Sequence, residues 1–269
     1  MKYRNWANQD YLPAVEGYWN EYARGDVVEQ HTHEAAQIVH AAKGVMRVAA
    51  AGSYWVIPPG RGLWVPAGVP HGFECVTAVS VRTVYLSGDL SELPDRSEVW
   101  QISDLMREVI VRLAEGATQV ETPPLVALLL NEIERTEVLP LHIESPSDRR
   151  ALRVAEAVIN DPSDTRSLEA WARHAGASPR TLKRVFRAQT GLTFGQWRRQ
   201  VRLIAALELL AGGAPVTEVA FAVGYDSTSA FIEMFRAQLG TTPGKYFEAR
   251  SSGGKSEKAV ILQNKPNYR

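Results

Sequence analysis

Four residues in the first third of the chain have the types and spacing of a polar ligand site. His31 and His33 are one residue apart, Gln37 follows, and His71 ends the segment Pro66-Ala67-Gly68-Val69-Pro70-His71. On an extended strand, positions 31, 33 and 37 share a face because side chains alternate. Imidazole nitrogens bind divalent metal ions and also form hydrogen bonds with small polar molecules. His31, His33, Gln37 and His71 are therefore candidates to bind a ligand, through a metal ion or directly.

Gln37 determines the charge of such a site. Three neutral imidazoles and an amide leave a divalent ion with its full positive charge, which weakens metal binding and favours an anionic ligand. The alternative is that the four groups bond only one another or water and bind no ligand. Trp55 and Trp64 are further candidates for the pocket wall, although an aromatic residue on a strand is more often part of the core. Arg61 and Arg82 are candidate partners for an anion.

A second group of residues carries positive charge on a helix that is predicted to begin at Pro179. Arg180, Lys183 and Arg184 are exposed near the start of this helix in the predicted pattern. Arginine pairs with guanine through two hydrogen bonds, which gives about 1–3 kcal/mol of discrimination between bases. We expect these three residues to contact bases. Three further residues are expected to contact phosphates: Thr181, Arg187 and Arg199.

The last third of the chain contains an internal repeat with an offset of 49 residues. Phe186–Gly191 reads FRAQTG, and Phe235–Gly240 reads FRAQLG. Each copy is predicted to form helix, turn and helix, and Ser178 and Ser227 cap the second helix of each copy. Between them, Phe194–Ala211 predicts a connecting helix about 27 Å long, while neighbouring major grooves on one DNA face are ~34 Å apart. The pattern predicts two helix-turn-helix units on double-stranded DNA.

The second copy presents a surface with less charge than the first. Asp226 and Glu233 occupy positions that correspond to the reading surface of the first copy, and Arg236 is its basic residue. We expect lower affinity from this helix because it offers fewer cations to phosphate. The candidate DNA contacts of the second copy are Ser227, Thr228, Ser229 and Arg236.

Residues 149–249 resemble the DNA-binding domain of AraC-type transcription regulators. The resemblance rests on SPRTLKRVF at 178–186, on Arg202-Leu203 to Leu210, on AVGYDS at 222–227 and on TPGKY at 242–246. It is specific and spans about a hundred residues. It implies sequence-specific DNA binding, and Arg180, Lys183 and Arg184 match the base-contacting positions of the family.

Residues 27–86 are predicted to form short β-strands. Apolar runs at 37–40, 45–49, 54–57, 62–65 and 79–86 are separated by Gly and Pro, which is typical of a small barrel or a double-sheet jelly roll. The histidine segments resemble the two cupin motifs, which hold a metal with three His and a Glu, and Gln37 stands at the Glu position. Residues 27–249 look similar to the AraC subgroup that contains the nitroimidazole-resistance regulator, through GVM at 44–46, IPPGR at 57–61 and LWVPAG at 63–68.

Two amphipathic helices are predicted between the two regions, from Ser103 or Asp104 to Gly116 and from Pro123 to about Thr136. They pack on the barrel or form a subunit interface, and the resemblance favours a homodimer. The expected fold class is α+β with two domains. Residues 1–98 form a cupin-like β-barrel, with 1–22 as an arm packed against it; 99–148 form a helical hairpin for dimerisation and a linker; 149–250 form an all-α double helix-turn-helix; and 251–269 form a flexible tail.

The charge of the chain is zero overall but unevenly distributed. Residues 1–148 contain 11 Lys and Arg against 20 Asp and Glu, whereas residues 149–250 contain 15 against 9. The second part therefore has the positive charge that phosphate binding requires.

Cys75 is the single cysteine, which excludes an internal disulfide and fits a reducing compartment. Without an apolar run of ~18 residues or a secretory signal, we expect a cytoplasmic protein with no membrane partner.

These patterns favour a DNA-binding transcription regulator whose DNA binding or activation responds to a small-molecule effector in the cupin pocket. The resemblance adds RNA polymerase as a candidate partner. The alternative is a metal-dependent cupin enzyme, a dioxygenase or isomerase, with an accessory helical domain. Gln37 in place of the carboxylate argues against the enzyme, and we identify no Ser-His-Asp set or phosphate-binding glycine loop. No catalytic residue is therefore expected.

Overall fold

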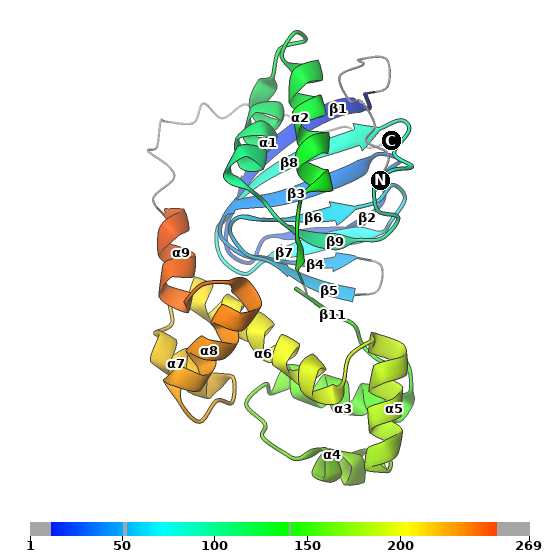
Figure 1. Ribbon diagram of the computed structural model, residues 1–269, viewed down its shortest axis with the longest axis vertical. Helices are drawn as coiled ribbons and strands as arrows, with labels where there is room; N and C mark the ends of the chain where they lie inside the picture. Colours follow the sequence, from blue (N-terminus) through cyan, green and yellow to red (C-terminus); the bar gives the residue numbers. More distant parts are fainter. Residues whose placement is uncertain (1–11, 51–52, 140, 252–269) are drawn as a thin grey trace.

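The computed structural model describes residues 12–50, 53–139 and 141–251, with side chains to residue 247. Its N-terminal part is mainly β-structure and its C-terminal part is helical (Figure 1). The strands of the N-terminal part are β1 (Ala14–Tyr22), β2 (Val27–His31), β3 (Ala36–Lys43), β4 (Met46–Ala50), β5 (Ser53–Ile57), β6 (Arg61–Val65), β7 (His71–Cys75), β8 (Val79–Ser87) and β9 (Glu98–Gln101).

The strands form two antiparallel sheets. Two further short strands, β10 (Val138–Leu139) and β11 (His142–Ile143), complete the sheets. The six-stranded sheet has the order β1-β8-β3-β6-β9-β10, and the five-stranded sheet has the order β11-β5-β4-β7-β2. This arrangement confirms the predicted β-rich cupin-like domain. One difference lies at its start, where residues 14–22 form strand β1 along the whole of β8. Residues 1–11, the rest of the predicted arm, lie outside the described residues.

Both faces of the six-stranded sheet are buried, because the side chains of β3 alternate between two cores. Gln37 and Val39 face the space between the sheets. Ile38 and its cross-strand partner Trp64 face the opposite way and pack on two helices. These are α1 (Asp104–Gly116) and α2 (Thr122–Glu134), the predicted hairpin, which covers the outer face of this sheet in Figure 1. The hydroxyl of Ser103 accepts a hydrogen bond from the backbone N–H of Met106 and caps α1 as expected.

The C-terminal part is built around α6 (Phe194–Ala211), whose bounds agree with the sequence prediction. Figure 1 places α3 (Arg149–Asn160), α4 (Leu168–Ala175) and α5 (Pro179–Thr190) at one end of α6. It places α7 (Val216–Ala222), α8 (Thr228–Leu239) and α9 (Pro243–Ser251) at the other end. Ser178 and Ser227 cap the second helix of each repeat as predicted.

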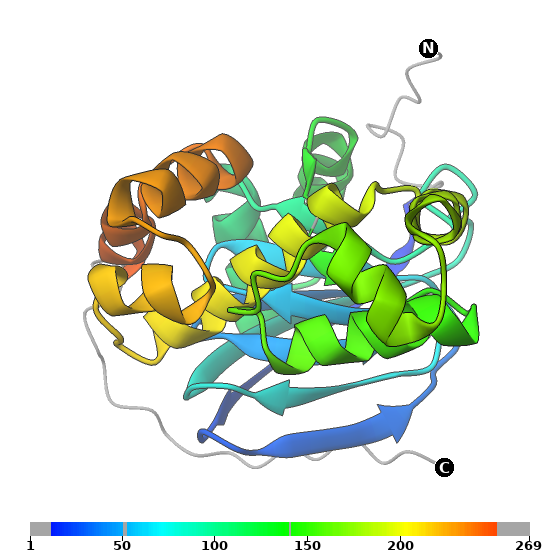
Figure 2. The same ribbon diagram turned by 90° about the horizontal axis from the view of Figure 1, so that it is seen from below.

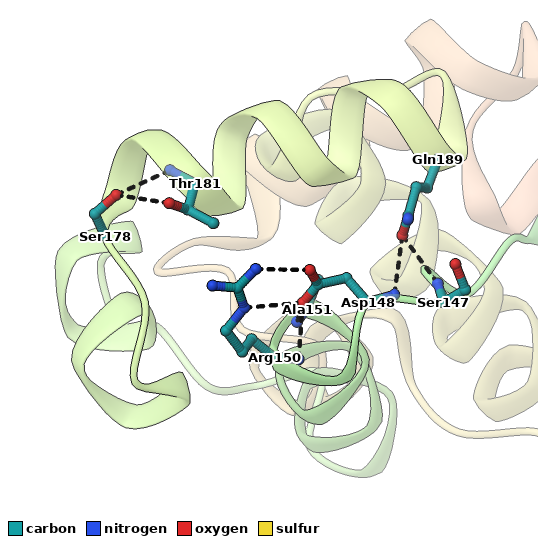
Figure 3. A network of polar contacts seen from close by, with 7 residues as sticks. All are labelled: Ser147, Asp148, Arg150, Ala151, Ser178, Thr181 and Gln189. Atoms are coloured by element: carbon teal, nitrogen blue, oxygen red, sulfur yellow. Dashed lines mark hydrogen bonds and ion pairs between the residues drawn. The ribbon is translucent and has the colours of Figure 1, made fainter.

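The linker between the two parts is ordered by both of them. β10 (Val138–Leu139) pairs with β9, and β11 (His142–Ile143) pairs with β5, so each sheet gains an edge strand. At the other end, the side-chain oxygen of Gln189 on α5 accepts hydrogen bonds from the backbone N–H groups of Ser147 and Asp148 (Figure 3). Asp148 in turn caps α3. The linker is thus a structured connection.

The expected flexible tail falls on residues 252–269, which lie outside the described residues. Within the described residues, the helices are all too short or too polar to cross a membrane.

Candidate functional site

A cavity of about 300 Å³ lies between the two sheets, at the end formed by β2, β7 and β8. The lining is partly apolar and partly polar, and it carries no formal charge when the imidazoles are neutral. Its apolar members are Val28, Val39, Val48, Phe73 and Val81, and its polar members are Tyr18, Tyr22, His31, Gln37, His71, Thr83 and Tyr85.

The structure brings the three predicted histidines together, with His31 and His71 in the lining of this cavity and His33 beside them. His31 ends β2, His71 begins β7, and the two residues are paired in register across these strands. His33 lies in the turn after β2, with its ring centroid 4.9 Å from that of His71. One nitrogen from each of the three rings lies within 4.8 Å of the other two. Strand pairing therefore brings together residues that are far apart in the sequence.

Backbone carbonyls fix the orientation of all three rings. The Nδ1 atoms of His31, His33 and His71 lie 2.9, 2.6 and 2.8 Å from the carbonyl oxygens of residues 29, 35 and 69, respectively. Because a carbonyl oxygen only accepts, each Nδ1 donates, and each neutral ring presents its lone pair at Nε2. Burial lowers the pKa of His71 to about 4, so this ring is neutral at physiological pH.

Three neighbouring imidazoles that each offer an accepting nitrogen make this site suitable for a cation. The Nε2 atom of His71 is buried without a hydrogen-bond partner among the described residues. The Nε2 atom of His33 lies 3.2 Å from the Oε1 atom of Gln37. Since both of these atoms accept, the contact requires either the opposite orientation of the amide or a cation near both atoms. The residues therefore fit a divalent metal ion bound by three imidazoles.

Two tryptophans that were predicted for the pocket lie outside its lining. Trp64 faces the helical hairpin, where it stacks on Trp100 with ring centroids 5.3 Å apart and donates to the carbonyl of Pro94. Trp55 lies on β5 and stacks on His142 of the linker at 4.5 Å. The prediction was wrong for both residues. Side chains alternate along a strand, so Trp64 points to the face of its sheet that α1 and α2 cover. Trp55 lies on β5, and two strands separate β5 from β2, which carries His31.

The two candidate anion-binding arginines also lie elsewhere. Arg82 forms ion pairs with Glu21 and Glu115. Arg61 is buried with its guanidinium 5.3 Å from the ring centroid of Tyr246 on α9. Other pocket residues were not predicted from the sequence, although alternation along β8 marks positions 81, 83 and 85 as one face. The missed polar residues are Tyr18, Tyr22, Thr83 and Tyr85.

The predicted DNA-reading face of α5 is exposed. Arg180, Lys183 and Arg184 lie on the surface, while Leu182 and Phe186 on the opposite side are buried. The two predicted phosphate contacts on this helix have structural partners as well. The hydroxyl of Thr181 lies 2.9 Å from that of Ser178, and Arg187 donates to the carbonyl of Gly191 at 2.7 Å.

The second reading helix, α8, exposes fewer cations. Ser227 caps it by accepting from the backbone N–H of Ala230, Thr228 is half-buried, and Ser229 and Arg236 are exposed. Arg199 on α6 is also exposed. All predicted contact residues other than Thr228 and Thr181 therefore lie on the surface.

Arg202 also lies on α6, but it is buried, unlike the exposed Arg199. Only 9% of it is exposed, and it donates hydrogen bonds to the carbonyls of Pro162 and Asp164, at 3.0 and 3.2 Å. Its guanidinium lies 5.5 Å from the ring centroid of Tyr225. It thus joins the α3–α4 loop to the second helix-turn-helix unit.

Replacing Arg202 with methionine should therefore lower the free energy of unfolding by about 1–3 kcal/mol, because two half-buried carbonyls lose their charged donor. Chemical denaturation measures this change. Arg199→Met on the exposed face of the same helix is the control, and its effect should stay within about 0.5 kcal/mol. Equal stability of the two variants would contradict the structural role of Arg202.

Comparison with known proteins finds a matching family model for the β-rich part and another for the helical part. Residues 12–133 match the model of the AraC-like ligand binding domain, and residues 171–249 match that of a helix-turn-helix domain. The HTH-type transcriptional regulator NimR of Escherichia coli K12 is 33% identical over 220 residues, which cover 80% of this chain and 81% of NimR. The chain belongs to the AraC family of transcription regulators.

Other similar proteins align with this AraC-family regulator over different extents. The HTH-type transcriptional regulator RipA of Corynebacterium glutamicum is 39% identical over 101 residues, or 38% of this chain and 30% of RipA. The crystal structure of ToxT from Vibrio cholerae covers 88% of this chain and 99% of its own, with 11% identity and a TM-score of 0.39. In this AraC-family regulator, the ligand-binding match includes all the residues that line the cavity, and the helix-turn-helix match includes α5 and α8.

Proposed function

We propose that this AraC-family regulator binds a divalent metal ion through the Nε2 atoms of His31, His33 and His71, beside Gln37, and that the ion helps to hold a small anionic effector. The observation that supports this proposal most directly is the set of three Nδ1–carbonyl hydrogen bonds, which leave the Nε2 atom of each ring as an acceptor in a cluster whose nitrogens lie within 4.8 Å of one another. Such backbone contacts orient metal-binding histidines in many proteins.

The charge of the cavity indicates the class of effector. Its described lining contains no Lys, Arg, Asp or Glu, so the protein itself offers an anion no charged partner there. When bound, the ion supplies positive charge that a carboxylate or a similar group can contact. The valines and Phe73 accept an apolar body, and the tyrosine hydroxyls and Thr83 can hydrogen-bond its polar edges. If the site takes no metal, the same histidines would bind a neutral polar ligand directly.

DNA recognition is assigned mainly to α5. Arg180, Lys183 and Arg184 contact base edges in one major groove, and Arg187 and Arg199 contact phosphates. The α8 helix occupies a neighbouring groove with Ser229 and Arg236, and it adds less affinity because it carries less charge. Exposure of these side chains supports the assignment. The protein acts where its DNA lies, in the cytoplasm, by binding rather than by catalysis.

The test is selection of a DNA site from a random-sequence pool, followed by binding measurements across salt concentrations. A preferred site with a steep log–log dependence on salt is the expected result. Absence of any sequence preference in folded protein would overturn the assignment of α5 and α8. The cavity would then be examined for catalysis that depends on His71.

The α1–α2 hairpin is proposed as the surface of a homodimer. It lies on the outside of the six-stranded sheet, where Leu105 is 49% exposed and Leu125 and Leu128 are half-buried. Replacing both Leu125 and Leu128 with glutamate should convert a dimer into a monomer, because charge is costly in an apolar interface. Sedimentation velocity measures the change. An unchanged dimer would place the interface elsewhere.

RNA polymerase remains a proposed partner of the DNA-bound protein.

A further inference from the structure

The helical part is held on the outer face of the five-stranded sheet by an ion-pair network. Glu208 on α6 accepts two hydrogen bonds from the guanidinium of Arg47 on β4, at 3.1 and 2.8 Å. Arg47 also pairs with Glu74 on β7, at 3.2 Å. We call Arg47, Glu74 and Glu208 the interdomain latch. Seen from the helical side in Figure 2, α6 crosses the strands of the N-terminal part.

The geometry of the latch favours one position of α6. Two parallel hydrogen bonds between a guanidinium and a carboxylate fix direction as well as distance. Glu208 is only 20% exposed, so water screens this pair less than an ordinary surface pair. A second contact in the same interface is the hydrogen bond from the indole of Trp197 on α6 to the carbonyl of Glu144 in the linker, at 2.8 Å.

The strands that carry the latch also form the wall of the cavity. Val48 and Phe73 face inward and line the cavity. Their neighbours Arg47 and Glu74 face outward, because successive side chains on a strand point to opposite faces. Arg47 and Glu74 are paired in register across β4 and β7, as are Val48 and Phe73. A ligand that changes the distance between Val48 and Phe73 therefore also acts on Arg47 and Glu74, which lie next to them on the same two strands, and through Arg47 on Glu208.

We propose that the latch transmits occupancy of the cavity to α6 and so regulates DNA binding. α6 joins the two helix-turn-helix units, with α5 packed at one end and α7 at the other. A change in the Arg47–Glu208 ion pair alters the position of α5 and α8 relative to the β-domain. In a dimer it also alters their position relative to the partner subunit. This step rests on the proposed function, namely that the cavity binds a ligand.

The first experiment tests the latch without any ligand. Glu208→Gln and Arg47→Met each remove the ion pair, and Glu156→Gln, an exposed glutamate of α3, is the matched control. A glutamate-specific protease is used on the full chain, and mass spectrometry measures the fragment that ends at Glu144. We expect cleavage about three to ten times faster in each latch variant, as for loss of a partly exposed charged contact.

The double variant Arg47→Met with Glu208→Gln distinguishes a specific contact from general weakening. If the two side chains act through each other, the double variant is cleaved no faster than the single variants. The control should match the wild type. Multiplicative effects of the two substitutions, or cleavage at the wild-type rate in both single variants, would overturn the proposal.

The second experiment measures coupling to the cavity, with zinc as the probe. In the wild type, adding zinc to metal-free protein should change the affinity for the selected DNA site by about fivefold or more. In Glu208→Gln, zinc should bind with unchanged affinity and leave DNA affinity unchanged. A full response in this variant, or zinc binding without any response in the wild type, contradicts the latch. If zinc does not bind the wild type, the metal proposal fails, and the protease experiment still decides whether the latch holds α6.

Discussion

Replacing His33 with alanine is expected to lower zinc affinity by more than about 100-fold. Loss of a residue that merely orients a ligand costs 10–100-fold in affinity, and His33 is proposed as a ligand itself. It lies in a turn and is half-buried, so its removal should disturb the sheets less than removal of the buried His71. The measurement is metal content after purification without an affinity tag, followed by titration of metal-free protein.

His174→Ala is the control for this experiment, because this exposed histidine lies on α4 in the helical part. It should bind zinc like the wild type. Equal and negligible metal in the wild type and in His33→Ala would eliminate the metal proposal. The three histidines would then contact the effector directly.

Gln37→Glu is expected to raise zinc affinity, whereas His33→Ala is expected to lower it. A carboxylate beside three imidazoles neutralises part of the charge of the ion, so zinc affinity should rise by at least about tenfold. Gln37 is only 6% exposed, so without metal the new carboxylate is buried among neutral rings and should destabilise the protein. Thermal unfolding should therefore show a larger gain from zinc in this variant than in the wild type. A gain no larger than that of the wild type would place residue 37 outside the metal site.

Replacing Arg184 with alanine is expected to change which DNA sequences the protein prefers. Arg184 is exposed on α5, and a bidentate contact to guanine contributes about 1–3 kcal/mol of discrimination. The variant should lose roughly 5- to 150-fold in affinity for the selected site and much less for sites with another base at one position. A competition assay over single-base variants of the site measures this pattern.

Arg199→Ala is the matched comparison, because this exposed arginine of α6 is assigned to phosphate. It should weaken binding to all sequences about equally and lower the slope of log affinity against log salt by about 1. If both variants lose only affinity that is independent of sequence, the division into base and phosphate contacts is wrong.

The sequence by itself determined the local structure of the helical part and its family. The caps Ser178 and Ser227 and the full length of α6 agree with prediction, because a helix begins where a nearby side chain satisfies its first N–H groups. The repeat added a second, independent instance of each signal. The histidine positions were likewise readable, since spacing and resemblance both indicated one site.

Only the tertiary structure decided which partners distant residues acquire. The direction of Trp64 depends on a hairpin that covers the second face of its sheet, and the burial of Arg202 depends on carbonyls in another loop. The proton positions of the three histidines depend on the backbone carbonyls of residues 29, 35 and 69, and Arg47 meets Glu208 across 161 positions of sequence. Helix caps act over three residues and can be read locally, whereas strand pairing and domain docking join segments whose distance in the sequence carries no signal.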